Sequence, residues 1–318
     1  MKFGRGFDQL TAWLLACFLV GGMAIGVYAL LQASFKQTTK EEIRDRSKER
    51  IFADAKILDR LTEERLAEEQ EDDEEEDSEE EDASFDLEKF EKAAMWTYQG
   101  AQGPESWGSI NDIYRACSRG HKQSPINIED AMVQTDLKPL KFYYTQVIVN
   151  TLNDSHALVV KFEGGNYLVF RGERFDLMQI IWHQPSEHKV NGSSFDMEME
   201  LVHQNEEHKQ LILSLFMQEG SVNNELAKIW HHLPKEAGSE GAAANFDVTR
   251  LLPRESNYYY YEGSLTRPPC SEGVMRLLMV QPVRISSAQV DSFLQLFKRN
   301  IRPLQARNHR KVKLSVSK

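Results

Sequence analysis

Hydrophobic and polar residues alternate with a period of two over much of the C-terminal two thirds of the chain, a pattern typical of β-strands. Turn-forming residues separate the alternating runs. Within this part of the chain, only 225–232 and 287–298 have a helical pattern, and a serine precedes the second stretch as a cap. The predicted strands cover residues 143–151, 157–162, 167–171, 177–183, 195–203, 210–217, 257–264 and 273–280. Many strands with few helices predict a mainly β (α+β) fold with a large, mostly antiparallel sheet.

Two of these strands are joined by a polar turn. Residues 177–183 are apolar and 195–203 alternate strongly, and the turn between them contains an Asn-Gly hairpin signal. Because side chains alternate along a strand, positions 181 and 183 share a face, as do 198 and 200. A pair of residues on one strand and a single residue on the next is one arrangement for a three-ligand metal site. The residues here are Ile181, His183 and Glu200, of which only His183 is a good zinc ligand.

The N-terminal part of the chain has a different character. Residues 10–31 form an uncharged run of about 22 residues, long enough to span a bilayer as a helix. The alternative is a cleaved signal peptide with a site near Ala33, but the apolar core is long for that, so an uncleaved anchor is favoured. Residues 40–70 follow as a charged helical pattern with too few apolar positions to face a core, which indicates a stalk.

An acidic run at residues 68–82 dominates the formal net charge of −11. The rest of the chain is close to neutral, so the composition argues against a nucleic-acid binder. A block of like charge is usually a solvated tether, and a cation-binding or partner-docking tail is the alternative. The predicted organisation is a membrane anchor at 1–35, a charged stalk with an acidic linker at 36–92, and a globular domain at 93–318.

Six motifs in this domain resemble, in order, those of the α-class carbonic anhydrases. They are W-T-Y-Q-G at 96–100, G-P-E-S-W-G at 103–108, Q-S-P-I-N-I at 123–128, P-S-E-H at 185–188, E-L-V-H at 200–203 and G-S-L-T-R-P-P-C-S-E-G at 263–273. The resemblance implies a twisted central sheet and a zinc ion held by three histidines, whose bound water attacks carbon dioxide. Those histidine positions correspond to Ile181, His183 and Glu200. The chain is therefore similar to a carbonic anhydrase-related member that lacks the zinc triad.

The resemblance also assigns other residues to the family's pocket. Glu187 and Thr266 match the pair that orients the zinc-bound hydroxide, and His156 matches the proton shuttle. His188 matches a structural, hydrogen-bonded histidine. The remaining matches are Gln179 beside the ligand strand, and Val202, Ile212 and Leu265 in the apolar wall where carbon dioxide sits. Much of the pocket around the metal position is therefore expected to survive.

Two arginines depart from the family's pattern. Arg276 stands where the family has a large tryptophan, and Arg267 where a small threonine or a histidine is usual. A carboxylate in a closed pocket is costly unless a cation accompanies it. We therefore expect one of these arginines to pair with Glu200 in the space that zinc would fill, and His183 to remain as a neutral hydrogen-bonding residue.

Cys117 and Cys270 match the disulfide of extracellular and bacterial members of the family, and two buried free thiols are the alternative. A disulfide implies an oxidising compartment. The basic residues that follow the apolar run outnumber those before it, which would instead place the domain in the cytoplasm. The disulfide is given more weight, so the domain is expected on the non-cytoplasmic side, in a periplasm, lumen or extracellular space.

The favoured function is that of a membrane-anchored, non-catalytic protein that binds a protein partner or scaffolds a membrane assembly, with no cofactor. One alternative is an active carbonate dehydratase, a lyase, with zinc at a rebuilt site made by His183, Glu200 and a third ligand. Another is adhesion to polyanions through the basic C-terminal segment 298–318, which by default is a solvated end.

Overall fold

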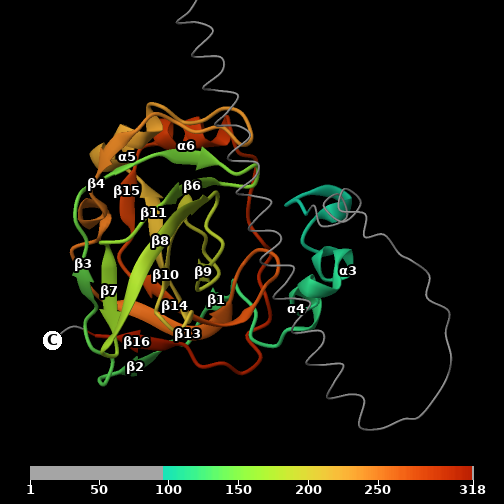
Figure 1. The fold of residues 1–318 in the computed structure, drawn as a ribbon. Coiled ribbons are helices and arrows are strands. Elements are labelled where there is room, and N and C mark those ends of the chain that lie inside the picture. The colour runs from blue at the N-terminus through green and yellow to red at the C-terminus, as the bar shows by residue number, and fades with distance from the viewer. Residues whose placement is uncertain (1–95, 317–318) are drawn as a thin grey trace, which may run out of the picture. The chain divides into compact units, whose positions relative to one another are not determined.

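The computed structural model describes residues 96–316, in which strands predominate (Figure 1). The strands are β1 (Asn127–Ile128), β2 (Met132–Gln134), β3 (Lys141–Tyr143), β4 (Val147–Val149), β5 (Thr151–Asn153), β6 (Leu158–Lys161), β7 (Tyr167–Phe170), β8 (Glu173–His183), β9 (Lys189–Val190), β10 (Met197–Gln204), β11 (Gln210–Glu219), β12 (Ala244–Phe246), β13 (Tyr258–Ser264), β14 (Glu272–Met279), β15 (Val283–Ile285) and β16 (Lys313–Ser315). The helices are α3 (Trp107–Ile110), α4 (Ala116–Arg119), α5 (Asn224–Trp230) and α6 (Ser287–Leu294), with 3-10 turns at Gly100–Gln102, Asp112–Tyr114 and Val248–Leu251.

Within the described residues, one sheet of 12 strands organises the domain. Its main path runs β2-β16-β13-β14-β11-β10-β8-β6-β5, with β15 beside β11 and with β7 between β3 and β8. Neighbours are antiparallel except where β11 meets β14 and β15 and where β16 meets β2. The predicted fold class, a mostly antiparallel sheet with a few short helices, is confirmed.

Seven of the predicted strands correspond to observed ones, but the single strand predicted at 143–151 is wrong. The chain instead breaks into the end of β3, then β4 and β5. The backbone N–H of Thr145 donates to the side chain of Asn166, and the buried Tyr144 points inward to His203. Strand β4 then pairs with β12 in a separate sheet, while β5 joins β6. Tertiary contacts thus override a run of β-forming residues.

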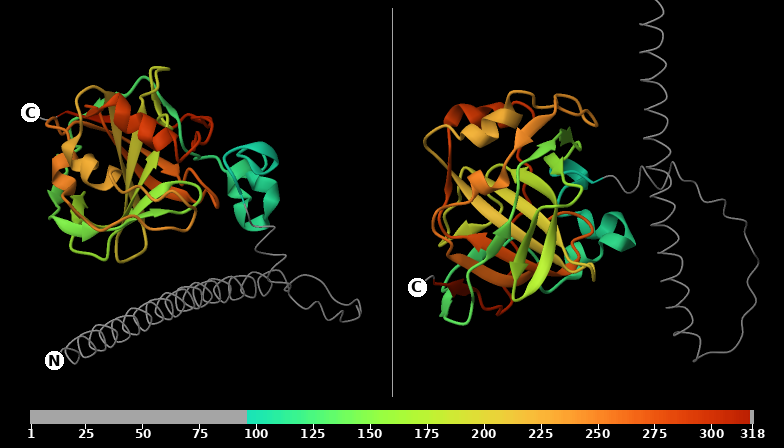
Figure 2. Two further views of the ribbon diagram at one scale, coloured as in Figure 1. Left: turned by 90° about the horizontal axis from the view of Figure 1, so that it is seen from above. Right: turned by 60° about the vertical axis from the view of Figure 1, so that its left-hand side comes forward.

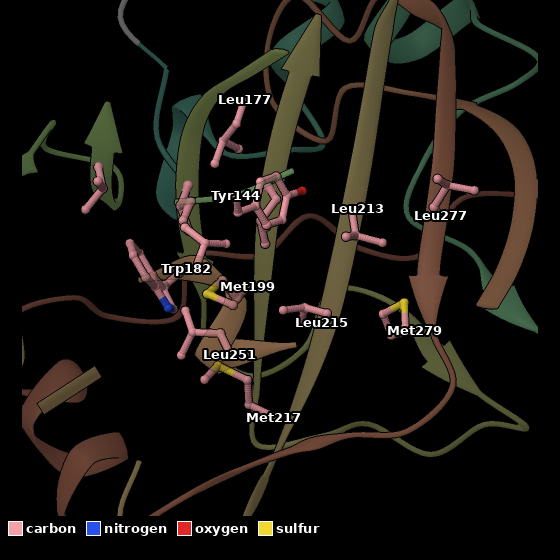
Figure 3. Close-up of a cluster of buried hydrophobic side chains, with 14 of the residues drawn as sticks. Tyr144, Leu177, Trp182, Met199, Leu213, Leu215, Met217, Leu251, Leu277 and Met279 are labelled. Atoms are coloured by element: carbon pink, nitrogen blue, oxygen red, sulfur yellow. The ribbon is translucent and has the colours of Figure 1, made fainter. Parts of the chain in front are cut away.

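The two faces of the central strands have different roles. The main core lies on one face, where Figure 3 shows Trp182, Met199, Leu213 and Leu277 projecting from neighbouring strands. Helices α5 and α6 lie side by side at one end of this sheet (Figures 1 and 2), and Trp230 of α5 stacks on Phe293 of α6. The alternate residues of the same strands point to the opposite face. That second face holds the candidate site.

Helix α6 begins as the sequence predicts but ends earlier. Ser286 is the N-cap, and it forms a capping box with Gln289. The helix stops at Leu294, four residues before the predicted end at 298. The chain then extends and brings Asn300 to the backbone of β8, where its side-chain amide donates to the carbonyl of Trp182. The Asn-Gly turn is also confirmed: Asn191 and Gly192 both have positive φ, and Val190 and Ser193 exchange backbone hydrogen bonds around them.

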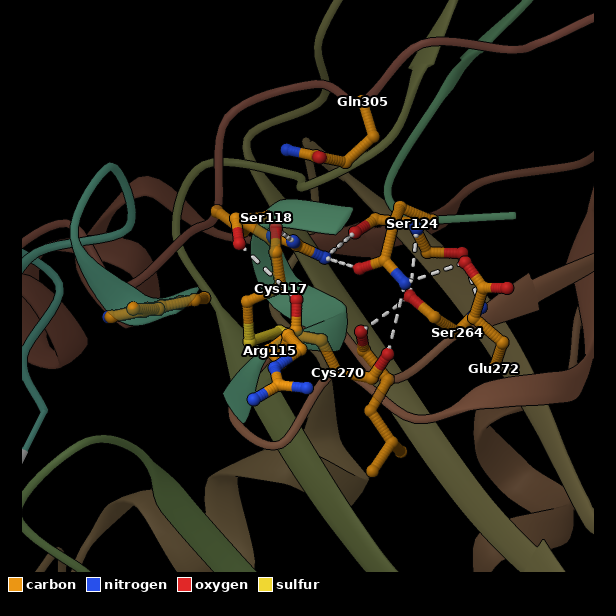
Figure 4. Close-up of a disulfide and its surroundings, with 12 residues drawn as sticks. Arg115, Cys117, Ser118, Ser124, Ser264, Cys270, Glu272 and Gln305 are labelled. Atoms are coloured by element: carbon orange, nitrogen blue, oxygen red, sulfur yellow. Dashed lines mark hydrogen bonds between the residues drawn. A yellow bond between two sulfur atoms is a disulfide. The ribbon is translucent and has the colours of Figure 1, made fainter. Parts of the chain in front are cut away.

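A disulfide joins α4 to the loop before β14. Cys117 and Cys270 are bonded, with their Cα atoms 5.0 Å apart, which confirms the pairing expected from the resemblance (Figure 4). The C-terminal segment lies against the same region. Arg302 is buried and donates to the carbonyls of Cys117 and Ser124, and β16 pairs with both β13 and β2. The expectation of a solvated end at 298–318 is therefore wrong for the parts that pack on the domain, although residues such as Lys298, Arg299 and Lys311 are exposed.

Three predictions fall on residues before 96 and lie outside the described part of the chain: the membrane anchor, the stalk and the acidic linker. Among residues 96–316, no helix has the length and apolarity needed to cross a bilayer. The membrane anchor at 10–31 stays a prediction.

Candidate functional site

The candidate site is built on four adjacent strands. Glu200 of β10 lies directly opposite Ile181 of β8 on one side and Ser214 of β11 on the other. Arg276 of β14 is opposite Ile212 of β11. Because alternate residues share a face, these strands present the site residues together on the face that points away from the main core. The strand prediction thus placed position 181 beside position 200 correctly.

The centre of the site is an ion pair. The guanidinium Nη2 of Arg276 donates to Oε1 of Glu200, and both side chains are almost completely buried. Burial alone would raise the pKa of Glu200, but Arg276 and then His183 lower it well below its usual range. Glu200 in turn keeps the pKa of Arg276 above its ordinary value despite burial. The structure therefore has the Arg–Glu200 pair expected from the sequence, and Arg276 provides it.

Arg267, the other candidate cation, is engaged elsewhere. Its Nη1 lies 3.2 Å from Oδ2 of Asp154, in a pair that is about a quarter exposed on each side. Asp154 also accepts from the backbone N–H groups of His156 and Ala157, so it is a fixed partner. Arg267 thus closes the rim of the site and does not neutralise Glu200.

His183 is fixed by a hydrogen bond and faces two carboxylates. Its Nδ1–H donates to the backbone carbonyl of Asn300 at 2.8 Å, so Nε2 points to the other side. Nε2 lies 3.8 Å from Oε2 of Glu187 and 3.8 Å from Oε2 of Glu200. Burial would lower the pKa of His183, but these two carboxylates raise it to about 9. The sequence, which did not place Glu187 this close, predicts a neutral imidazole, whereas these two carboxylates favour the protonated form.

Glu187 keeps the contacts that the family resemblance implies. Its Oε1 accepts from the backbone N–H of Arg302 at 3.0 Å, and the nearby side chain of Thr266 acts to lower its pKa. Burial raises its pKa, although the charge of His183 opposes the rise. The predicted Thr266–Glu187 pair is present beside His183.

His188 is a structural residue, as expected. Its Nδ1 lies 2.8 Å from Oε1 of Glu198, and its Nε2 lies 2.6 Å from the hydroxyl of Tyr261. The Tyr261 hydroxyl also bonds Ser124. Burial would raise the pKa of Glu198, but His188 holds it below its usual value. Both ring nitrogens of His188 are used in this network, so neither is free to bind a ligand.

The predicted apolar wall is present, and Ile181 belongs to it. The three predicted wall residues pack in one cluster with the aliphatic side chains around them: Ala157, Val159, Ile181, Val202, Ile212, Leu265 and Val274. Gln179, two residues before Ile181 on β8, is half-buried at the edge of this face. Ile181 is thus part of the apolar wall, at the position where the resemblance implies a zinc-binding histidine.

His156, at the position of the family's proton shuttle, is held in place by its neighbours. Its ring stacks on Trp96 with centroids 3.8 Å apart and planes 19° apart. Its Nε2 donates to the carbonyl of Trp96 at 2.8 Å, and its Nδ1 lies 3.2 Å from the Ser155 hydroxyl. A shuttling imidazole needs free nitrogen atoms, and both nitrogens of His156 have partners.

Sequence reasoning missed Asn300, Ser214 and Arg302. Asn300 orients His183 through its carbonyl and also accepts from the N–H of Gln184. It lies 117 residues from His183 along the chain, so no local pattern could identify it. Ser214 could have been predicted from the alternation along residues 210–217, because it shares a face with the predicted wall residue Ile212. In the structure it lies opposite Glu200.

The residues present do not fit the zinc site of three histidines. At its three positions, Ile181 has no donor atom, Glu200 is bonded to Arg276, and only His183 offers an imidazole. A different set of donors does converge: ligand atoms of His183, Glu187 and Glu200 all lie within 4.8 Å of one another. The guanidinium of Arg276 beside one of these carboxylates opposes a cation there.

Comparison with known proteins places the fold and the site in a family. The model of the eukaryotic-type carbonic anhydrase family matches residues 102–316. The carbonic anhydrase of Neisseria gonorrhoeae is 38% identical over 219 residues, covering 68% of this chain and 86% of that protein. The carbonic anhydrase of Klebsiella pneumoniae is 37% identical over 224 residues, covering 69% of this chain and 91% of that protein. The chain belongs to the α-type carbonic anhydrase family.

Solved structures agree with this assignment. The α-carbonic anhydrase of Thermovibrio ammonificans, in complex with the inhibitor sulfanilamide, has a TM-score of 0.68 and 39% identity, covering 69% of this chain and 99% of that one. Dioscorin complexed with ascorbate has a TM-score of 0.65 and 28% identity, covering 70% of this chain and 100% of that one. The N-terminal residues 1–95 lie outside the family match.

Proposed function

We propose that this chain is a non-catalytic member of the carbonic anhydrase family that serves as a binding or scaffolding module. The observation that carries the proposal is the buried Arg276–Glu200 pair beside Ile181, where the resemblance places two zinc-binding histidines. Without a metal to lower the pKa of a bound water, the pocket has no group that generates hydroxide at neutral pH. The relatives from Neisseria gonorrhoeae and Klebsiella pneumoniae are named carbonic anhydrases, so the loss of catalysis is proposed for this chain and not for them.

The test is metal analysis of the purified full-length chain together with stopped-flow measurement of carbon dioxide hydration. The expected results are far less than one zinc per chain and a hydration rate equal to that of the buffer. A matched control is the Ile181→Ala variant, which changes the apolar wall without adding a ligand and should behave in the same way. Equimolar zinc with hydration that a sulfonamide inhibits would overturn the proposal.

The competing function is carbon dioxide hydration at a rebuilt metal site. The observation in its favour is the convergence of His183, Glu187 and Glu200, whose ligand atoms lie within 4.8 Å. Three protein ligands with an open position are what a catalytic zinc site needs. If this function is correct, Glu187→Gln abolishes both zinc binding and hydration. Glu207→Gln, which removes a carboxylate from an exposed ion pair with Lys209, retains both.

The proposed setting is a membrane assembly, with the domain on the non-cytoplasmic side. The Cys117–Cys270 disulfide supports an oxidising compartment, and the uncharged run at 10–31 supports an anchor. Protease treatment of right-side-out and inverted membrane vesicles tests the orientation, since the domain should be degraded only in right-side-out vesicles. Adhesion to polyanions is not proposed, because Arg302, Arg307 and Arg310 donate to backbone carbonyls of the domain itself.

A further inference from the structure

A cavity of about 630 Å³ adjoins the site on the side of His156. Three segments that are distant in sequence form it: residues 96–99, the turn at 155–156, and residues 296–300 after α6. Its volume is in the range of cavities that hold a small organic ligand. Neither the family's reaction nor the Arg276–Glu200 pair accounts for this cavity.

One wall of the cavity is flat, aromatic and rigid. Trp96 stacks on His156 and makes edge contacts with Tyr98 and Trp107, at centroid distances of 5.2 Å to each. The indole N–H of Trp107 donates to the carbonyl of Thr97, which fixes the backbone of this wall. A planar apolar group can therefore lie against this wall without any rearrangement of the protein.

Another part of the lining contains two cations. Lys298 and Arg299 are exposed at the rim, and among residues 96–316 no Asp or Glu lines the cavity. Among the described residues, neither side chain forms an ion pair or a hydrogen bond, whereas nearby Arg267 is paired with Asp154. The local charge is thus complementary to an anion.

The inner end of the cavity is connected to the candidate site. Asn300 lines the cavity, and its carbonyl accepts from His183 while its side chain bonds the backbone on both sides of that residue. Hydrogen bonds to the end of β8 therefore fix the position of Asn300, whereas Lys298 and Arg299 are exposed. The cavity therefore has a fixed base, an aromatic wall and a cationic rim.

We propose that this cavity binds a small organic anion with a planar apolar body, of the aromatic carboxylate class. The ring lies against Trp96, and the carboxylate faces Lys298 and Arg299. The proposal is independent of whether the chain holds zinc, since none of the atoms it uses is a donor at positions 181, 183 or 200.

The test is a ligand-observed NMR titration of the full-length chain with 2-naphthoate at low ionic strength. A ligand of this size in such a cavity should bind with a Kd of about 1 mM or tighter. The neutral isostere 2-naphthamide should bind about tenfold more weakly, because it lacks the charge that faces the rim. The double variant Lys298→Ala/Arg299→Ala should bind naphthoate about tenfold more weakly than the wild type does, and its affinity for the amide should be unchanged.

Two further variants separate the aromatic wall from general charge effects. Trp96→Leu should weaken both ligands, and Trp96→Phe should restore most of the loss, because it keeps a flat ring. Lys138→Ala/Lys141→Ala removes the same charge at a distant cavity and should change nothing. The proposal is overturned if the wild type does not bind naphthoate, if the amide binds equally well, or if the two double variants have equal effects. Zinc content, measured on the same samples, reports separately on the proposed lack of catalysis.

Discussion

Arg276 of β14 reaches across β11 and donates to the carboxylate of Glu200 on β10, so a cation and an acid of this chain fill the centre of a pocket that holds a metal elsewhere in the family. The pair lies between the apolar wall that contains Ile181 and the buried Glu198–His188 pair. If either Arg276 or Glu200 is removed, the other is left as a buried charge without its main partner. This mutual dependence leads to the first prediction.

Removing only the cation should be strongly destabilising. Arg276→Leu leaves Glu200 buried without its main partner, and the free energy of unfolding should fall by about 3–5 kcal/mol. The double variant Arg276→Leu/Glu200→Leu removes both charges and should be within about 1–2 kcal/mol of the wild type. Urea denaturation followed by circular dichroism measures both. Equal losses in the single and double variants would show that packing, and not charge, sets the cost.

The disulfide should contribute measurably to stability because it closes a long loop. Cys117 and Cys270 are separated by 153 residues, and cross-links of this kind are worth about 2–5 kcal/mol in the free energy of unfolding. We expect Cys117→Ala/Cys270→Ala to lower stability by that amount. Cys17→Ala, which leaves the bridge intact, is the control. Intact mass after alkylation, with and without reductant, confirms the bonding state, and no stability change in the double variant would contradict the prediction.

The sequence predicted the site's chemistry where a local rule applied. Alternation along 177–183 and 195–203 placed positions 181, 183 and 200 on one face. The rule that a buried acid needs a cation then gave Arg276 and Arg267 as candidate partners of Glu200, of which the structure has Arg276. The first step required no distant segment, because the two strands are adjacent in sequence. The second depended on the family resemblance, because both arginines depart from the family's pattern.

The rest of the site depends on contacts that no local pattern encodes. Asn300 reaches His183 from 117 residues away, and Arg302 reaches Gln123 from 179 residues away. The electrostatic surroundings of His183 were missed for the same reason, since they depend on how close the chain after Pro185 brings Glu187. The strand predicted at 143–151 failed because Tyr144 is drawn inward to His203, which lies 59 residues further on.

His203 should make stability depend on pH. It is fully buried, its Nδ1–H donates to the carbonyl of Leu201, and its Nε2 accepts from the hydroxyl of Tyr144. Burial lowers the pKa of His203 to about 3, against 6.5 for an ordinary histidine. Between these values the unfolded chain binds the proton and the folded chain does not. The stabilisation is therefore complete above pH 6.5 and is lost as the pH falls toward 3.

The size of this effect follows from the slope of about 1.4 kcal/mol per pH unit for one proton. Between pH 6.5 and pH 5, His203 should account for about 2 kcal/mol of lost stability. His203→Gln, which retains polar atoms but does not titrate, should lack this component. Urea denaturation of both proteins at several pH values isolates it as a difference. Parallel pH profiles for the two proteins would mean that the imidazole is protonated in the folded state.

Zinc binding should be recoverable by restoring the ligands and removing the cation together. Ile181→His/Glu200→His/Arg276→Trp places three imidazoles on β8 and β10, and the tryptophan refills the volume of the arginine. Three neutral imidazoles form a zinc site with an open position, so this variant should retain one zinc per chain after dialysis against metal-free buffer. Ile181→His/Glu200→His with Arg276 retained should bind zinc more weakly, because an unpaired guanidinium then lies beside the metal position.

Elemental analysis and cobalt substitution spectra measure metal binding by both variants. If the triple variant folds and takes up no metal, the pocket has changed in more than its ligands; if the wild type already retains one zinc, Arg276 does not exclude the ion.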